Sequence, residues 1–383
     1  MPSASPLAGL RVLDFSVFLP GALLTQWLAS LGARVIMIER PGRRHFLALD
    51  DQHPYYAVLR RGKKSIVLNL KDPDDYAVAR ALLRWADVLV EGFRPGVMER
   101  LNLGPETARA VNPRLVYVRL SGFGQTGPYR QRPGHDQIYQ ALAGLLSPWG
   151  EPPVLPPVQI ADVGGGTLPA LVALLAALWA RERTGQGTCI DVSLYEGALA
   201  WTYFLLPMHR RTAQDQAWLR VFLGQVPAYH VYQTKDGFWI ALSALEPHFW
   251  DAFCRAVGRP EWGTRAFDPD LIPEVAEVFR AHTLAEWLGP DGQGGILDPE
   301  QISVAAVRTV SEVLQDPHLR AREAFAFDAL GYVHPRLPMR FDGQRPPAPA
   351  HVPQPNEHAP WIRALAQGDT QAEARLFGPT PAF

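Results

Sequence analysis

The sequence predicts an α/β protein, with a large unit built on a parallel β-sheet and a smaller α+β unit later in the chain. Up to residue 123, short apolar segments of strand type alternate with segments of helical spacing. From about residue 198 this alternation gives way to a hairpin pattern. The chain has 383 residues, which is long enough for two domains.

The alternation begins with a βαβ pattern. Residues 10–17 form a short apolar strand, 21–33 have helical spacing, and 34–40 form a second strand. The pattern continues with strands at 65–70, 87–93 and 114–123, a helix over 72–86 and a helix that ends near Val111. Strands that are apolar on both faces are typical of a parallel sheet covered on both sides, where ligands bind beyond the carboxyl ends of the strands.

The later part of the chain has a different pattern. Residues 226–242 predict a β-hairpin that turns at Lys235-Asp236-Gly237, and a helix follows from Pro247. Segments 289–301 and 345–355 are rich in glycine or proline and predict loops. We expect the last helix, "APWIRALAQG", to pack back on the first domain.

Composition excludes several classes of protein. Lysine and arginine (37) nearly balance aspartate and glutamate (38), so no attraction to nucleic acid or to an anionic membrane is expected. Cys189 and Cys254 have no spaced partners, which excludes a disulfide scaffold or a cysteine zinc site. The apolar run 168–180 is shorter than the roughly 20 residues of a membrane span and predicts a buried helix. With no signal-peptide pattern at residues 1–15, these features predict a cytoplasmic protein with a small-molecule partner.

The ends of the first strands carry charged residues. Glu39 stands where a dinucleotide-binding fold keeps an acid for ribose, but the turn "SVFLPGALL" lacks G-x-G-x-x-G, so nicotinamide binding is not expected. Basic residues follow several strands, and each taken alone is typical of a solvated surface. Together they favour a ligand with several phosphates. They are Arg40, Arg43, Arg44, the run 60–64, Lys71, Arg94 and Arg100.

Two segments offer candidate proton-transfer groups. In "PGHDQIYQ", His135 and Asp136 open a predicted helix over 136–148, where free backbone N–H groups favour negative charge. The structural alternative is a polar histidine beside a first-turn acid. Asp162 precedes three glycines between an apolar segment, taken as a strand, and a strongly apolar helix. It is either a helix cap or a functional carboxylate, and the glycines indicate a close backbone approach.

Two further residues, Glu246 and His358, each stand at a predicted helix start. Either is explained as a polar residue of the first helical turn. The sequence contains no H-E-x-x-H, G-x-S-x-G or Walker motif and no clustered metal ligands, so we expect no metal.

The chain resembles the family III CoA transferases nearly end to end. The segments that carry the resemblance are "LAGLRVLDFS", "LASLGARVIMIERPG", "ADVLVEGFRPGVMERLNLGPE", "NPRLVYVRLSGFGQTGPY", "ADVGGG", "RTGQGTCIDVSLYEGAL", "TKDGFWIALSALEPHFW", "LQDPHLRAREAF" and "PNEHAPWIRAL". Within the superfamily, "GHDQIYQALAGLLS" is most similar to the G-H-D-x-x-Y of the α-methylacyl-CoA racemases. The transferases usually lack this histidine.

The resemblance implies a role for each candidate residue. In transferases the aspartate before the glycines is the nucleophile that forms an acyl adduct, whereas in racemases it is one of two acid/base groups. His135 favours the racemase reaction, with Asp162 as the second group and Glu246 as the residue that orients His135. Tyr229 is then expected near the carboxylate. The implied CoA contacts are Arg40, Leu68, Asn69, Leu70, Lys71, Gly92, Phe93, Arg94, Arg100, Gly134, Asp136 and Tyr139.

The expected reaction is racemisation of 2-methyl-branched acyl-CoA thioesters. One group removes the weakly acidic α-hydrogen, the other delivers a proton to the opposite face, and first-turn N–H groups of the helix after His135 stabilise the enolate. Asp162 must then hold a proton near neutral pH, which requires a raised pKa. Two alternatives stay open: a CoA transferase working through an Asp162 adduct, and a non-catalytic CoA-binding protein. No separate cofactor is expected, because CoA enters as part of the substrate.

The resemblance also implies an architecture: an interlocked homodimer in which each subunit has a large Rossmann-like domain made from both chain ends. In this sequence the large domain is expected to comprise 1–197 and 323–383, and the small α+β domain 222–310. Residues 198–221 and 311–322 are then linkers.

Overall fold

The computed structural model describes residues 5–42, 53–146, 155–210, 212–290, 292 and 294–379. The chain divides into two compact units. Unit 1 comprises Met1–Thr202 and Leu319–Phe383, and unit 2 comprises Tyr203–His318. Each unit is built on a β-sheet of its own.

The sheet of unit 1 has six parallel strands in the order β3-β2-β1-β4-β5-β6. The order reverses between β1 and β4, because the chain builds outward from β1 in one direction and then returns to its other side. The predicted alternation of strands and helices is therefore confirmed. The strands are β1 (Arg11–Asp14), β2 (Arg34–Glu39), β3 (Lys64–Val67), β4 (Val88–Glu91), β5 (Val116–Ser121) and β6 (Cys189–Ser193).

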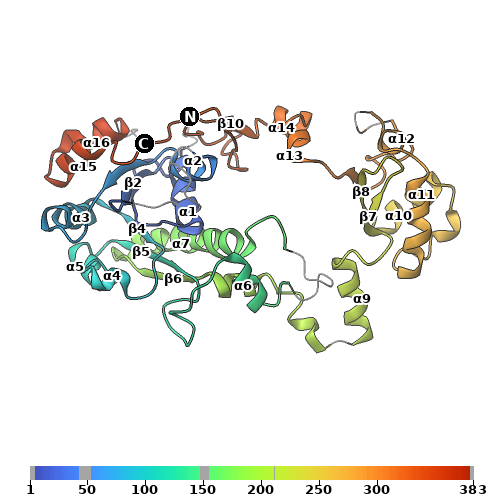
Figure 1. The fold of residues 1–383 in the computed structure, drawn as a ribbon, viewed down its shortest axis with the longest axis horizontal. Coiled ribbons are helices and arrows are strands. Elements are labelled where there is room, and N and C mark those ends of the chain that lie inside the picture. Colours follow the sequence, from blue (N-terminus) through green and yellow to red (C-terminus); the bar gives the residue numbers. More distant parts are fainter. Residues whose placement is uncertain are drawn as a thin grey trace. The chain divides into compact units, whose positions relative to one another are not determined.

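Helices cover both faces of this sheet (Figure 1). On one face, valines from alternate strand positions pack against α1 (Leu19–Ser30) and α7 (Leu168–Thr184). The other face packs against α3 (Pro73–Trp85), α4 (Val97–Arg100), α5 (Pro105–Val111), α15 (Ala359–Ala366) and α16 (Thr370–Phe377). Because a strand with two buried faces needs apolar side chains at every position, these strands read as continuous apolar runs.

Three local predictions differ from the structure. The segment before the three glycines is not a strand but the start of a π-helix, Ile160–Thr167. The helix after His135 is α6 (Asp136–Leu142), which is shorter than predicted because the chain turns at Gly144, whose φ is +81°. The edge strand β6 was not predicted, because its exposed residues give it no apolar run.

The predicted buried helix at 168–180 is buried on one side only. Ala170, Leu171 and Leu174 of α7 pack on the sheet, whereas Val172 is 68% exposed and Trp179 69% exposed. The π-helix and α7 form one continuous helix of 25 residues, Ile160–Thr184. By length and composition alone this helix could cross a membrane, so the 13-residue apolar run underestimated its length.

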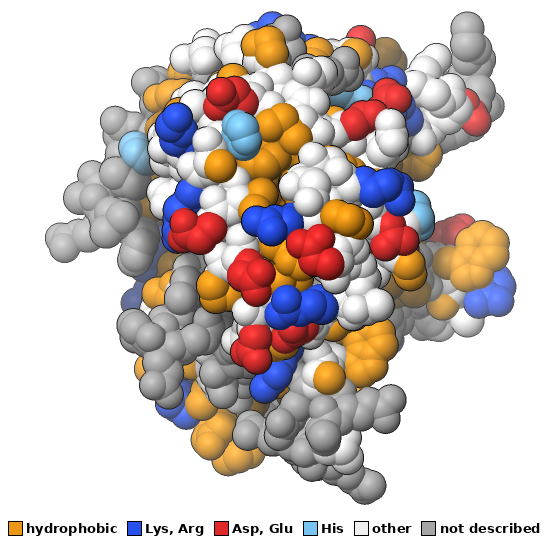
Figure 2. Space-filling model, turned by 90° about the vertical axis from the view of Figure 1, so that its right-hand side faces the viewer, with side chains coloured by type: hydrophobic (Ala, Val, Ile, Leu, Met, Phe, Trp, Pro, Cys, Tyr) orange, Lys and Arg blue, Asp and Glu red, His pale blue; other side chains and the backbone are white. Residues whose placement is uncertain are grey.

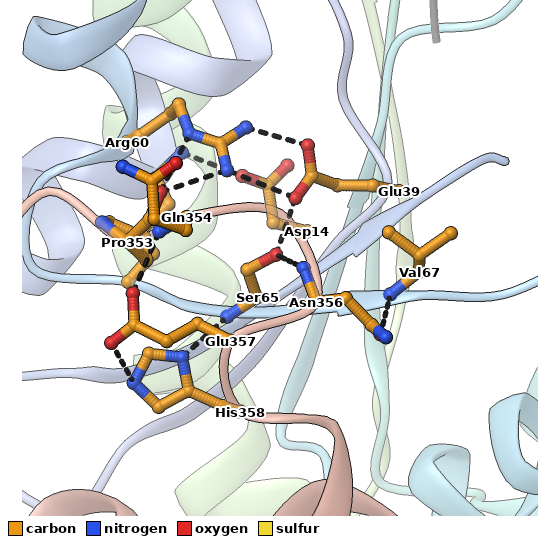
Figure 3. A network of polar contacts seen from close by, with 11 residues as sticks. Asp14, Glu39, Arg60, Ser65, Val67, Pro353, Gln354, Asn356, Glu357 and His358 are labelled. Carbon is orange, nitrogen blue, oxygen red and sulfur yellow. Dashed lines mark hydrogen bonds and ion pairs between the residues drawn. The ribbon is translucent and has the colours of Figure 1, made fainter. Parts of the chain in front are cut away.

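The C-terminal segment of the chain seals the edge of the sheet at β3 (Figure 3). The His358 N–H donates to the Ser65 carbonyl at 3.0 Å, and the Asn356 side-chain oxygen accepts the N–H of Val67 at 2.9 Å. Behind this seam, Arg60 pairs with the buried Glu39 at 2.6 Å and also donates to the Pro353 carbonyl. An edge strand that would otherwise present unpaired backbone groups is thereby covered.

Unit 2 is built on an antiparallel sheet of β7 (Tyr229–Gln233), β8 (Trp239–Ser243) and β9 (Val304–Ala306). The predicted hairpin turn is confirmed, with φ at Gly237 of +84°. The core packs aromatic residues of α10 (Pro247–Ala256), α11 (Ile272–Arg280) and α12 (Leu284–Leu288) against the sheet. Figure 2 shows acidic and basic side chains interspersed on the viewed face, which agrees with pairs such as Arg265–Asp268 at 2.8 Å.

The remaining elements are short. In unit 1 they are α2 (Pro54–Arg60), α8 (Leu194–Ala200), β10 (Phe325–Phe327) and β11 (Val333–Pro335). In unit 2 they are α9 (Ala213–Phe222), α13 (Val310–Val313) and 3₁₀ turns at Pro207–Arg210, Pro260–Trp262 and Pro269–Leu271, and α14 (Pro317–Ala321) spans the boundary between the units.

Candidate active site

A pocket of unit 1 lies where the strand order reverses. Its walls come from the segments that follow β1, β4 and β5, with Pro20, Gly92 and Gly122 among the lining residues. Ligands of open parallel sheets bind beyond the carboxyl ends of the strands at such a reversal, where the connections on either side run apart. The predicted residues Phe93, Arg94, Gly134, His135, Tyr139 and Asp162 also line this pocket.

His135 is the N-cap residue of α6. Its backbone is extended, with φ of −132°, and its carbonyl accepts the N–H of Ile138 at 2.8 Å. The side chain makes no capping hydrogen bond, and it meets the ring of Phe18 edge to face at 6.3 Å between centroids. The imidazole is therefore presented to the pocket rather than used to start the helix.

Asp162 lies in the first turn of the π-helix. Burial raises the pKa of its carboxyl to about 7, and the negative charge of Asp136 adds to this rise. Within the described part of the chain no cation forms an ion pair with Asp162, which would have lowered the value. A carboxyl group with this pKa can hold a proton and release it near neutral pH.

The glycines after Asp162 serve helix packing. A side chain on Gly165 would meet the backbone of Gly197 in α8 at 2.6 Å, and one on Gly166 would meet Leu194 at 2.3 Å. The close approach inferred from the glycine run is therefore between the π-helix and α8. The Thr167 hydroxyl, which donates to the Pro20 carbonyl at 2.8 Å, also ties the π-helix to α1.

Tyr139 forms part of the pocket wall. Its ring is 4% exposed and packs where a side chain on Gly122 or Gly134 would clash, at 2.4 and 2.6 Å respectively. Burial and then the charge of Asp162 raise the pKa of its phenol to about 12. Tyr139 therefore stays neutral, and a side chain at either glycine would displace its ring.

Sequence reasoning missed several residues of the pocket, among them one aromatic residue and two arginines. Phe18, Arg130 and Arg132 all line it, and the guanidinium of Arg132 lies over the ring of Tyr129 at 5.2 Å. The available signal was the pair of arginines in "YRQRPG", directly before His135. With Arg94, they make a basic rim suited to phosphate or carboxylate groups.

The turn after β4 is held by Glu91, which also escaped prediction. Its carboxylate accepts the N–H of Phe93 at 2.7 Å and a bond from Arg119 at 3.0 Å. Burial raises the pKa of Glu91 to about 7 in spite of these bonds. Because Gly92, Phe93 and Arg94 line the pocket, this buried group fixes one of its walls.

The other predicted contact residues lie outside the pocket lining. Arg40 and the segment 68–71 follow β2 and β3, so they share the carboxyl edge of the sheet, and the Leu68 side chain belongs to the core. Arg100 ends α4. Tyr229 begins β7, and Glu246 is the N-cap of α10, both in unit 2. Arg43 and Arg44 lie outside the described residues.

Two further groups of polar side chains, around Glu39 and around His358, lie at the β3 edge of the sheet. Glu39 is 6% exposed and its two carboxylate oxygens bond to Arg60 and Ser65, so it is not presented to a ribose. His351, Glu357 and His358 offer ligand atoms within 4.8 Å of one another, a group that the sequence did not predict.

The hydrogen bonds of this group favour an ordinary network over a metal site. The Nδ1 atom of His358 accepts the N–H of Ser65 at 3.3 Å, and burial and then Lys64 lower its pKa to about 4. The neutral ring therefore carries its proton on Nε2 and donates it towards Glu357 (Figure 3). An Nε2 atom that bears a proton does not bind a metal.

The fold and the site together define a protein class: a doubly wound α/β protein whose switch-point pocket joins an imidazole, a protonatable carboxyl group and a basic rim. The sequence model of CoA-transferase family III matches residues 7–359. The chain belongs to this family, and it is an enzyme of the family's racemase and CoA-transferase group.

The relatives include both activities. The α-methylacyl-CoA racemase of Homo sapiens is 37% identical over 339 residues, which cover 86% of this chain and 85% of the relative. The succinyl-CoA–D-citramalate CoA-transferase of Chloroflexus aurantiacus is 34% identical over 335 residues, covering 83% and 82%. A crystal structure of a hypothetical protein from Mycobacterium tuberculosis has a TM-score of 0.79 at 29% identity, covering 94% of this chain and 99% of that one.

Proposed function

We propose that the protein is an acyl-CoA racemase or epimerase that inverts the α-carbon of 2-methyl-branched acyl-CoA thioesters. The observation that carries the proposal is the pocket shared by His135 and Asp162. Two groups that exchange protons near neutral pH are what a two-base inversion requires. The racemase relative supports the same substrate class.

In the proposed mechanism, neutral His135 removes the α-hydrogen of one epimer while protonated Asp162 delivers a proton to the opposite face. The reverse reaction exchanges the roles: the Asp162 carboxylate removes the hydrogen and protonated His135 delivers one. The intermediate is an enolate whose oxygen would lie towards the first-turn amides of α6, the helix that His135 begins. Glu246 would orient His135 and Tyr229 would lie near the carboxylate, as the family resemblance implies.

The basic rim supports a CoA thioester as the substrate. Arg94, Arg130 and Arg132 line the pocket that contains the proposed acid/base pair. Arg40 and Lys71 follow neighbouring strands of the same sheet and would extend this binding surface along its carboxyl edge. The 3′-phosphate and the pyrophosphate of CoA offer several negative charges to such a surface.

A CoA transferase is the second candidate, supported by the citramalate CoA-transferase relative. In that reaction the Asp162 carboxylate would attack the thioester carbonyl and expel CoA as thiolate, forming a mixed anhydride. CoA thiolate would attack the Asp162 carbonyl of this anhydride, release the acyl group as a free acid and leave an aspartyl-CoA thioester. An acceptor carboxylate would then take over the CoA by the reverse sequence.

Proton exchange in heavy water separates the two reactions. A 2-methylacyl-CoA incubated with the enzyme and no acceptor acid should gain one deuterium at the α-carbon, measured by mass spectrometry. His135→Ala should lower the exchange rate by about 10²–10⁴-fold, whereas His318→Ala, at an exposed position of α14, should not.

The absence of exchange in the wild-type enzyme would refute the racemase proposal. The transferase alternative predicts instead that turnover needs a free carboxylic acid and that hydroxylamine traps an Asp162 adduct during turnover. An enzyme that exchanges the α-hydrogen without an acceptor and is not trapped by hydroxylamine would exclude the transferase.

The proposal includes a homodimer. Leu168, Val172, Leu175 and Trp179 form an apolar face of α7 that is not covered by unit 1. Exposed apolar faces of this kind typically mark subunit interfaces, and we assign this one to a second copy of the chain. Light scattering should give twice the mass of one chain. Trp179→Glu should shift the mass towards that of one chain, and a wild-type monomer would contradict the proposal.

A further inference from the structure

Asp136 was expected among the CoA contacts, but its side chain bonds to the π-helix. Its Oδ1 atom accepts the backbone N–H groups of Ala161 and of Asp162, both at 2.8 Å. Its Oδ2 atom accepts the side-chain amide of Gln140, one turn further along α6. Asp136 is also absent from the residues that line the pocket.

These bonds join the two segments that carry the proposed acid/base pair. Asp136 directly follows His135 and begins α6, whereas Ala161 and Asp162 belong to the first turn of the π-helix. The first N–H groups of a helix have no partners within it, and a carboxylate is a strong acceptor for them. One side chain therefore caps the helix of Asp162 from the residue next to His135.

We propose that Asp136 is a positioning residue, which fixes the Asp162 segment relative to His135 through its two backbone N–H groups. This inference rests on the proposed function, in which His135 and Asp162 exchange protons with the substrate. The Asp136 side chain lies outside the pocket lining and is given no contact with the thioester or the migrating proton. It acts through the backbone of Asp162.

Asp136 is the charged group that acts most strongly on the Asp162 carboxyl. Burial and then Asp136 raise the Asp162 pKa, and no other group contributes to the shift. Titratable and charged groups on the surrounding elements are Tyr55 of α2, Tyr139 of α6, Tyr195 and Glu196 of α8, His135, and the rim residues Arg94, Arg130 and Arg132. Strand β6 adds Cys189 and Asp191, and the C-terminal end of α7 adds Arg181, Glu182 and Arg183. Helix α1, which packs on the π-helix, has no charged side chain.

The test is Asp136→Asn, which removes the charge and keeps an acceptor oxygen for both N–H groups. The new amide N–H₂ would face Gln140, whose Oε1 atom is buried without a hydrogen-bond partner. Rotation of the Gln140 amide then pairs the two side chains, so the fold should survive. Asp72→Asn is the matched control, because Asp72 caps α3 through two N–H groups in the same way.

We expect the bell-shaped pH profile of kcat/KM for α-hydrogen exchange to move to lower pH by about half a unit in Asp136→Asn, because its centre is the mean of two pKa values and only that of Asp162 falls by about one unit. Removing the negative charge makes Asp162 easier to ionise, so the form of the pair that holds one proton prevails at lower pH. Both directions of racemisation should shift together, because the overall equilibrium fixes their ratio. Asp72→Asn should leave the profile unchanged.

A second measurement does not depend on turnover. Carbodiimide and an amine label protonated carboxyl groups, and peptide mass spectrometry gives the midpoint pH of labelling at Asp162. This midpoint should fall by about one unit in Asp136→Asn. An unchanged midpoint would overturn the inference even if exchange is confirmed. Absence of exchange in the wild type would refute the proposed function, while a shifted midpoint would still support the coupling.

Discussion

Two kinds of buried carboxylate occur in the large unit, and their surroundings differ. Asp14 and Glu39 end neighbouring strands and are each paired with a cation: Lys63 at 2.7 Å and Arg60 at 2.6 Å. Asp162 has another carboxylate, Asp136, in place of a cation, and its pKa is about 7. Asp14 and Glu39, with their cations, join parts of the fold, whereas Asp162, without one, is able to exchange protons. Glu91 lies between the two kinds, because burial raises its pKa to about 7 although Arg119 is 3.0 Å away.

The largest effect on stability is expected at Lys63, where a substitution removes the cation that pairs with a buried carboxylate. Its ammonium group is fully buried and donates to Asp14, to Thr25 and to the Ala22 carbonyl. Lys63→Met leaves Asp14 as an uncompensated buried charge, so the free energy of unfolding should fall by about 3–5 kcal/mol. Urea denaturation measures this change. Lys71→Met, at an exposed position, should have little effect, and a comparable loss in both variants would contradict the assignment.

The second test removes the proposed functional carboxyl. The pKa of Asp162 is about 7 in the folded state against an ordinary 3.8, so the folded protein loses stability as pH rises from about 4 through about 7. Asp162→Asn removes this penalty. At pH 8 the variant should be more stable than the wild type by about 2–4 kcal/mol, although its exchange activity should be lost.

The pH dependence of this stability difference provides an internal control. Near pH 4 the wild-type carboxyl is protonated in the folded state, so the difference between the two proteins should largely vanish there. Thermal unfolding at pH 4, 6 and 8 would measure it. An Asp162→Asn variant that is less stable at pH 8 would show that the carboxylate is held by favourable contacts, like Asp14 and Glu39.

The smallest expected effect concerns the rim. Arg130→Gln and Arg132→Gln should each raise KM for an acyl-CoA by about tenfold or less, with kcat nearly unchanged, because charge pairs at an exposed rim are worth about 1 kcal/mol. The effect should shrink as salt rises. Arg114→Gln, an exposed arginine paired with Glu182, is the control. A large fall in kcat would place the rim arginines in the chemistry.

Most strands of the sheet, and the helices that cover it, could be predicted from their apolar patterns. The strands are apolar on both faces, and the helices are apolar on the face that packs on the sheet. The edge strand β6 has exposed positions and left no such signal. The π-helix was taken for a strand because Ala161 and Val163 make its start apolar, and its backbone follows from contact with α8 rather than from local preference. The glycine run did indicate a close approach, which α8 provides.

For the candidate site, "GHD" and "ADVGGG" were enough to single out His135 and Asp162, because the resemblance to a family is carried by those segments. The inward direction of the Asp136 side chain could not be read from the sequence. It depends on two N–H groups that lie 25 and 26 residues away in the chain. Arg130 and Arg132 were visible as charges, but only the fold places them at a pocket.

The seam between β3 and residues 353–358 has a consequence for synthesis of the protein. Arg60 and Ser65 leave the ribosome long before Pro353 and Asn356, their partners across about 290 positions. The nascent large unit therefore exposes one edge of its sheet, and the apolar surface on which α15 packs, until nearly the whole polypeptide has been made. Meanwhile the intervening unit, whose strands lie close in sequence, can assemble first. A chain cut short before this last segment would be prone to edge-to-edge aggregation.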